Sequence, residues 1–203
     1  LVANLLTVAG ADRILTMDLH CAQIQGFFDI PVDHLHGTPL LTNYYREKYG
    51  DKLEEFVAVS PDLGSVGRTR GFATRVDIPI AIIDKRRPKA NVSEIMNIIG
   101  NVDGKRVILV DDMIDTAGTI CKAADMLIDN GAASVRAVAT HAVLSGKAYE
   151  NIEKSKLTEV IFTDSIPQKQ PCSKIKVLPI APMFADTIRN IYEHKSISDH
   201  FLM

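Results

Sequence analysis

Short apolar runs alternate with amphipathic stretches along this chain of 203 residues. Several of the apolar runs contain no polar residue, which is typical of strands covered on both faces. The predicted strands are Ile14–Met17, Phe56–Val59, Ile78–Ile83, Arg106–Val110, Ser134–Thr140, Val160–Thr163 and Lys176–Pro179.

Between these runs, apolar residues recur at helical spacing. The predicted helices are one that begins at Thr38 with Pro39 next, and Gly64–Arg75, Val92–Ile99, Thr119–Asn130, Ala148–Lys154 and Met183–His194. The alternation predicts an α/β fold with a mainly parallel twisted sheet flanked by helices. Ligands bind such sheets beyond the carboxyl ends of the strands.

Composition narrows the class of protein. Hydrophobic residues make up 46% of the chain and charged residues 24%, and the net charge is only −2. We expect no nucleic-acid or membrane partner, because no strong field and no spanning apolar run is present. Three cysteines without metal-ligand spacing favour a cytoplasmic protein. The chain starts without Met inside an amphipathic pattern, so we expect an N-terminal truncation.

The segment Val107–Thr119 contains the most informative residues. An apolar run ends in Asp111 and Asp112, and Asp115-Thr116-Ala117-Gly118-Thr119 leads into a helical pattern. Free amides at a helix N-terminus attract phosphate, whereas carboxylates suit sugar hydroxyls or Mg²⁺. The combination predicts a site for a phosphorylated sugar. The structural alternative is a strand that ends in turn residues, with Thr as helix cap and Gly118 serving the bend.

A basic stretch follows another apolar run. Lys85, Arg86 and Arg87 come directly after Ile80–Ile83. A mobile cationic loop there would stabilise charge that develops on a polyphosphate. Taken alone, a solvated basic loop is the better explanation, because charge runs usually face solvent.

Two further strand ends carry polar residues. Asp18 and His20 follow Ile14–Met17, and Asp62 follows Phe56–Val59. His20 could bind a metal, contact phosphate or lie hydrogen-bonded in the core, and Asp62 could hold a metal or cap the next helix. Four strand ends with such residues at one edge of a sheet favour a functional site.

Together these stretches resemble the ribose-phosphate diphosphokinases, also called phosphoribosyl pyrophosphate synthetases. The resemblance covers essentially the whole chain and is carried by segments in the family's order: Ile14–Asp33, Ser60–Arg70, Asp84–Pro88 and Val110–Thr119. Asp111–Thr119 alone indicates only the broader type I phosphoribosyltransferase group.

The resemblance implies two similar α/β domains of the type I phosphoribosyltransferase fold. Residues 1–37 would be the last part of a truncated first domain, residues 38–195 the second domain, and residues 196–203 a tail that returns to the first. It also implies a homo-oligomer. Most of the first domain is absent, which leaves open whether the chain is active alone.

The implied reaction transfers the β,γ-diphosphoryl group of ATP to the anomeric hydroxyl of ribose 5-phosphate and releases AMP. By resemblance, the backbone and hydroxyls of Asp115, Thr116, Ala117, Gly118 and Thr119 bind the 5-phosphate. Asp111 and Asp112 would bind the ribose hydroxyls, directly or through Mg²⁺.

The resemblance also suggests roles outside the sugar site. His20 and Asp62 look like ligands of the Mg²⁺–ATP site, and Lys85 and Arg87 would stabilise the transition state. A weaker expectation is that Ser196 and Ser198 help bind a regulatory phosphate or ADP. Two alternatives stay open: a non-catalytic regulatory subunit of the same family, and a phosphoribosyltransferase that consumes phosphoribosyl pyrophosphate.

Overall fold

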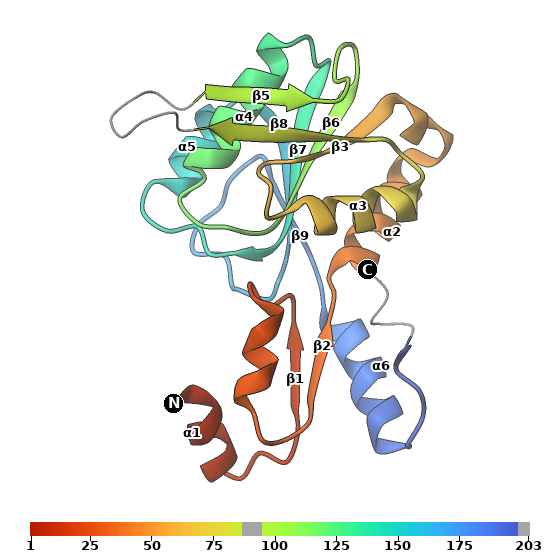
Figure 1. Cartoon of the computed structure of the whole chain (residues 1–203), viewed down its shortest axis with the longest axis vertical. Coiled ribbons are helices and arrows are strands. Elements are labelled where there is room, and N and C mark those ends of the chain that lie inside the picture. The colour runs from red at the N-terminus through yellow and green to blue at the C-terminus, as the bar shows by residue number, and fades with distance from the viewer. Residues whose placement is uncertain (87–94, 199–203) are drawn as a thin grey trace. The chain divides into compact units, whose positions relative to one another are not determined.

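The computed structural model describes residues 1–86 and 95–198 and divides into two compact units. Unit 1 combines Leu1–Gly37 with the chain from Ala181 onward, and unit 2 is Thr38–Ile180 (Figure 1). The sequence-based division places the return to the first domain at residue 196, whereas the structure assigns the chain to unit 1 from Ala181. Helix α6, Ala181–Tyr192, is therefore part of unit 1.

A seven-stranded sheet forms the centre of unit 2, in the order β5-β4-β3-β6-β7-β8-β9. All neighbouring strands are parallel except β4 and β5, so the predicted mainly parallel sheet is confirmed. The strands are β3 Phe56–Ser60, β4 Ile80–Arg86, β5 Ile95–Ile99, β6 Arg106–Ile114, β7 Ser134–Ala142, β8 Leu157–Thr163 and β9 Ile175–Leu178.

Helices cover both faces of this sheet, as Figure 1 shows. On one face, Val57 and Val59 pack in a core with Leu127 of α4; on the other, Phe56 packs with Phe72 of α3. This division follows from the strand period, which turns successive side chains to opposite faces. The elements of the two layers are α4 Gly118–Asp129 and α5 Ala148–Lys154, and α2 Thr38–Tyr49, the 3₁₀ helix η2 Gly50–Glu55 and α3 Val66–Val76.

Unit 1 contains a small parallel pair of strands. β1 runs parallel to β2 from the Ile14–Val32 pair to the Met17–Leu35 pair. Strand β2 is not predicted from the sequence, because a strand of four residues that includes Asp33 and His34 has no clear apolar run. The other elements are α1 Val2–Val8, the 3₁₀ helix η1 Ala22–Phe27 and α6; the strands are β1 Ile14–Met17 and β2 Val32–Leu35.

The structure corrects the prediction around the basic stretch. Ile95–Ile99 is strand β5 rather than the end of a helix, and it pairs antiparallel with β4. Ile98 and Ile99 lie opposite Ile83 and Ile82 of β4, so strand pairing outweighs the local helical pattern. Lys85 and Arg86 belong to strand β4 instead of a loop. Arg87 lies outside the described residues.

Strand β6 is longer than predicted and continues to Ile114, since its partner β7 continues to Ala142. Asp111 and Asp112 therefore belong to the strand itself. Helix α4 begins at Gly118, so this glycine is a helical residue and not only a bend. Helix α4 ends at Asp129, one residue before the predicted end at Asn130. Gly131 follows with φ +90°, and its amide donates to Ile128 O at 3.0 Å.

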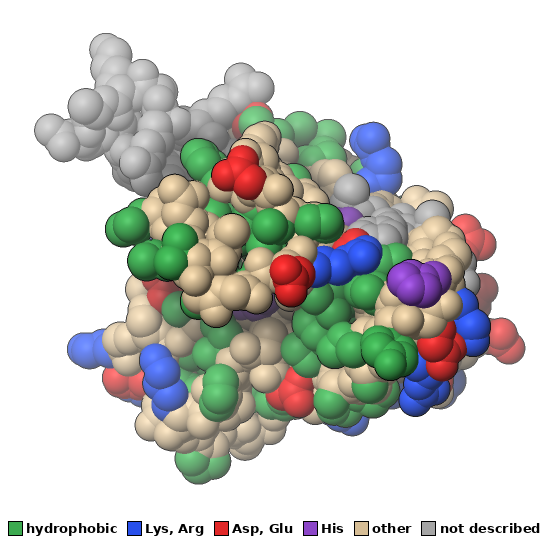
Figure 2. Space-filling model, turned by 90° about the horizontal axis from the view of Figure 1, so that it is seen from below, with side chains coloured by type: hydrophobic (Ala, Val, Ile, Leu, Met, Phe, Trp, Pro, Cys, Tyr) green, Lys and Arg blue, Asp and Glu red, His purple; other side chains and the backbone are tan. Residues whose placement is uncertain are grey.

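Large apolar side chains are exposed on the short helix α1 of unit 1. This helix buries only Ala3, while Leu1, Val2, Leu5 and Val8 are exposed. Figure 2 shows one face of the molecule, on which hydrophobic side chains lie among charged ones. No helix in the described part of the chain is long and apolar enough to span a bilayer.

Candidate functional site

A cavity of about 200 Å³ opens in unit 2, beyond the carboxyl ends of strands β3 and β6. Its lining brings together residues from two of the segments singled out in the sequence. The lining residues are Asp62, Asp111, Met113, Ile114, Asp115, Thr116, Ala117, Thr119 and Ile120. Asp112 and Gly118, which the sequence analysis also assigned to the sugar site, are not among them.

Ser65 links two of the carboxylates. Its amide donates to Asp62 Oδ1 at 2.9 Å and its hydroxyl donates to Asp111 Oδ1 at 2.9 Å. Asp62 accepts this amide just before helix α3 and also lines the cavity, so its carboxylate contributes to the local turn and faces the candidate site. Ser65 was not predicted from the sequence. Its spacing of three residues from Asp62, typical of an Asx turn, is the available signal.

The electrostatics of the cavity centre on Asp111. Burial raises the pKa of its carboxyl from 3.8 to about 6, and the neighbouring Asp112 also raises it. The hydrogen bonds from Ser65 and from the Asp112 amide oppose this shift. Asp112 itself is 6% exposed. The amide of Asp112 donates to Asp111 Oδ1 at 2.9 Å.

Residues Asp115–Ala117 form the turn between β6 and α4, which we call the anion loop. Ala117 has left-handed backbone angles, φ 61° and ψ 1°, at the N-cap of α4. This conformation costs a non-glycine residue about 1–2 kcal/mol, so neighbouring contacts must stabilise it. Three of them come from the segment after β7: Leu144 N to Ile114 O, Ser145 N to Asp115 O, and Asn151 Nδ2 to Thr116 O.

The basic residue Lys85 lies on the strand next to β3. In the parallel β3–β4 ladder Ile82 is opposite Ser60, so the backbone of Lys85 lies at the same sheet edge as Asp62. Lys85 is also opposite Met96 of β5. Strand pairing therefore fixes the backbone position of this residue.

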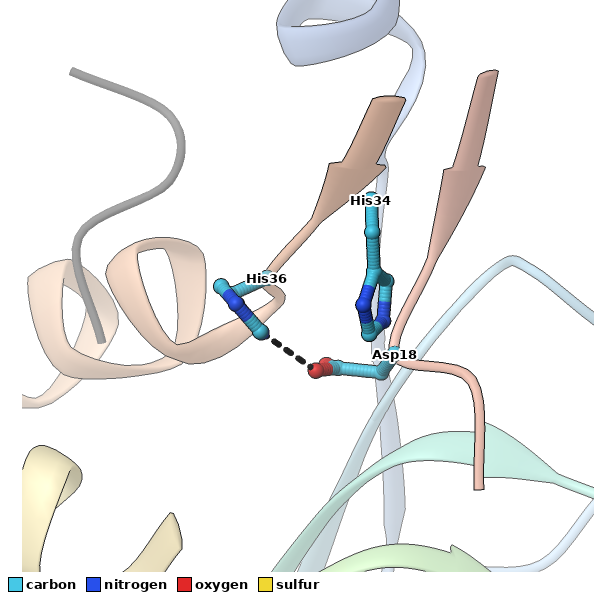
Figure 3. Close-up of side chains that lie close together, drawn as sticks. All are labelled: Asp18, His34 and His36. Carbon is cyan, nitrogen blue, oxygen red and sulfur yellow. Dashed lines mark hydrogen bonds and ion pairs between the residues drawn. The ribbon is translucent and has the colours of Figure 1, made fainter. Parts of the chain in front are cut away.

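In unit 1, His20 is exposed and follows strand β1. A different group there could hold a metal ion: Asp18, His34 and His36 offer ligand atoms within 4.8 Å of one another (Figure 3). Several of their polar atoms already take part in hydrogen bonds. Asp18 Oδ1 lies 3.2 Å from His36 Nδ1, and His34 Nε2 accepts the amide of Leu19 at 2.8 Å.

Asp18 also accepts the Gly37 amide through Oδ2, at 2.8 Å. This hydrogen-bonded cluster orders the turn that follows β2. His20 belongs to unit 1 and Asp62 to unit 2. The two serines near the C-terminus are exposed, and the Oγ atoms of Ser196 and Ser198 lie 2.8 Å apart.

Comparison with known families identifies the chain. Residues 85–202 match the family described as the phosphoribosyl synthetase-associated domain. The chain belongs to this family. The resemblance stated from the sequence motifs is thereby confirmed.

Relatives in this family extend the comparison. The ribose-phosphate pyrophosphokinase of Clostridium tetani is 59% identical over 203 residues, which are 99% of this chain and 63% of the relative. The enzyme of the same name from Clostridium perfringens is 58% identical and is covered to 64%. The chain thus spans a little under two thirds of the length of these relatives.

A solved structure supports the fold. The chain is similar to the phosphoribosylpyrophosphate synthetase from Mycobacterium smegmatis, with a TM-score of 0.85 and 45% identity over 95% of this chain and 63% of that one. The predicted fold of the phosphoribosyl pyrophosphate synthetases is therefore confirmed over nearly the whole chain.

Proposed function

We propose that the chain carries the ribose 5-phosphate site and part of the catalytic machinery of a ribose-phosphate pyrophosphokinase. One observation carries the proposal: Asp62 and Asp111 line the same cavity as the anion loop at the N-terminus of α4. Carboxylates accept hydrogen bonds from sugar hydroxyls, and helix N-terminal amides bind phosphate. A sugar phosphate needs both kinds of partner.

In the proposed reaction, the anomeric hydroxyl of ribose 5-phosphate attacks the β-phosphorus of ATP. The bond between the α,β-bridging oxygen and the β-phosphorus breaks, AMP leaves with that oxygen, and the hydroxyl loses its proton. Phosphoryl transfer depends mainly on positioning and on neutralisation of charge. Here the anion loop would bind the 5-phosphate, and Asp111 would position the hydroxyls of the ring.

The donor set of the cavity also fits Mg²⁺. Asp62 and Asp111 present carboxylate oxygens, which are the ligands that hard cations prefer. Mg²⁺ would neutralise the polyphosphate and orient it for attack. We propose Asp62 as a ligand of the Mg²⁺–ATP site and His20 as a second ligand or a phosphate contact, with Asp112 as further support for the sugar site.

Lys85 and Arg87 are the proposed stabilisers of the transition state, because a cation at the β4 end would neutralise charge that develops on the diphosphoryl group. We expect Lys85→Ala to lower turnover about a hundredfold or more, the magnitude typical of removing one preorganised charged or hydrogen-bonding group. Binding of ribose 5-phosphate, measured by calorimetry, should change little. Wild-type turnover in this variant would contradict the assigned role.

Incubation with ATP, Mg²⁺ and ribose 5-phosphate tests the function. Formation of AMP in step with phosphoribosyl pyrophosphate supports the proposal. Consumption of phosphoribosyl pyrophosphate together with a nucleobase would instead identify a phosphoribosyltransferase. If neither reaction occurs even in the protein extended to the length of its relatives, a regulatory subunit is the better assignment.

The remaining expectations from the family resemblance are part of the proposal. They are a cytoplasmic homo-oligomer, no nucleic-acid or membrane partner, and regulation by phosphate or ADP near Ser196 and Ser198. Ser198→Ala should change inhibition by ADP more than basal turnover. Unchanged inhibition would remove these serines from the regulatory site.

A further inference from the structure

Three consecutive carbonyl groups of the sugar-site segment bind one neighbouring stretch of chain. Ile114 O accepts the Leu144 amide at 3.1 Å, and Asp115 O accepts the Ser145 amide at 3.1 Å. Thr116 O accepts Asn151 Nδ2 at 3.0 Å. Residues 144–151 thus hold the carbonyl side of the anion loop.

Because the peptide bonds are trans, the direction of each carbonyl also determines the direction of the amide N–H in the same peptide group. No peptide bond in the described chain is cis, so each N–H points opposite to the carbonyl of the preceding residue. With the carbonyls of Asp115 and Thr116 held by residues 144–151, the amides of Thr116 and Ala117 point away from that stretch. Within residues 1–86 and 95–198, neither amide donates to a protein acceptor. Successive free amides form a concave anion site.

The hydrogen bond from Asn151 Nδ2 to Thr116 O bears directly on whether the anion loop can bind an anion. Ala117 occupies left-handed backbone angles, so the peptide between Thr116 and Ala117 is held in a disfavoured conformation. If this peptide turned over, Thr116 O would replace the Ala117 amide on the cavity side and repel an anion. The hydrogen bond from Asn151 opposes that rotation.

Ser145 acts on the adjacent residue. Its amide binds Asp115 O, and its hydroxyl donates to Asp115 Oδ1. The turn that brings it there needs left-handed angles at Leu144, φ 46°, and Gly146, φ 57°. Ser145, from the segment after β7, therefore fixes both the backbone and the carboxylate of Asp115.

We propose that Asn151 and Ser145 are positioning residues for the phosphate of the substrate, although neither lines the cavity. They hold the carbonyls of the anion loop outward, so that its amides stay available to a phosphate monoester. The identity of the ligand, ribose 5-phosphate, rests on the proposed function. The orientation of the amides does not.

Asn151→Asp tests this directly, because it replaces the amide donor with a carboxylate that repels Thr116 O. We expect binding of ribose 5-phosphate to the full chain to weaken at least tenfold in calorimetry. Asn130→Asp is the matched control: Asn130 Nδ2 donates to Met126 O at 2.8 Å, at the other end of α4. This control should bind ribose 5-phosphate as tightly as the wild type.

Amide resonances provide a readout that general destabilisation would not move. In Asn151→Asp without ligand, the ¹⁵N resonances of Thr116 and Ala117 should shift and those of the α4 C-terminal turn should not. Equal affinity in Asn151→Asp and wild type, or equal weakening in Asn130→Asp, would overturn the proposal. If Asn151→Asp does not fold, Asn151→Ala is measured in the same way.

Failure of the proposed function gives a distinguishable result. If the wild-type chain binds no ribose 5-phosphate, that function is wrong for this cavity. The resonances of Thr116 and Ala117 then still decide whether Asn151 holds the loop. Unchanged resonances in Asn151→Asp would show that it does not.

Discussion

Burial and the proposed ligand binding make opposite demands on the carboxylate of Asp111. Burial disfavours the charged form, whereas sugar hydroxyls and Mg²⁺ require it. The hydrogen bonds from Ser65 and from the Asp112 amide, each 2.9 Å, stabilise the charged form in part. The pKa of about 6 reflects this balance and leaves the group ionised at neutral pH.

Asp111 should therefore reduce stability as the pH rises. Its pKa is higher in the folded chain than its ordinary 3.8, so its favourable contribution is complete below about pH 4 and is lost by about pH 6. We expect Asp111→Asn to gain unfolding free energy relative to wild type between pH 4 and pH 7.5, measured by urea unfolding. A difference that stays constant over this range would contradict the assigned protonation behaviour.

At the scale of elements, helix α4 connects the core to the anion loop. Ala123, Ala124 and Leu127 are fully buried against the sheet, while the first residues of the helix border the cavity. The packing of α4 therefore determines where its N-terminal amides lie.

Leu127→Ala should cost about 2–5 kcal/mol of unfolding free energy, because it leaves a cavity in a fully packed core. The control is Ile99→Ala, whose side chain is 56% exposed on strand β5. Denaturant unfolding of both variants gives the comparison. A similar cost for the two substitutions would contradict the description of this core.

The sequence predicts the elements of the main sheet well, because continuous apolar runs such as Phe56–Val59 are typical of buried parallel strands. It misassigns Ile95–Ile99, since strand pairing with β4 decides that segment. At the site, Asp62, Asp111 and Asp115 are predictable from their position at strand ends. Ser145 and Asn151 are not, because only the tertiary fold brings their hydrogen bonds to the anion loop.

On the scale of the whole molecule, the two units differ in their means of stabilisation. Unit 2 has a seven-stranded sheet with a core on each face, whereas the sheet of unit 1 has two strands. Isolated two-stranded sheets are at best marginally stable in water. Most of the cooperative stability should therefore belong to unit 2.

Expression of residues 38–180 tests this difference. We expect this fragment to unfold in a single thermal transition, because both cores are complete within it. Leu127→Ala in the fragment should lower the midpoint of thermal unfolding. Such a decrease would show that the transition reports the native core. A fragment without a cooperative transition would show that unit 2 depends on unit 1.

The proposed function requires one cavity to bind the sugar through carboxylates and its phosphate through the amides of the anion loop. Titration of the ¹⁵N-labelled chain with ribose 5-phosphate, and in parallel with ribose, tests it most directly. We expect ribose 5-phosphate to bind more tightly than ribose and to shift the amide resonances of Thr116, Ala117 and Thr119. Equal binding of the two sugars, or shifts confined to other parts of the chain, would contradict it.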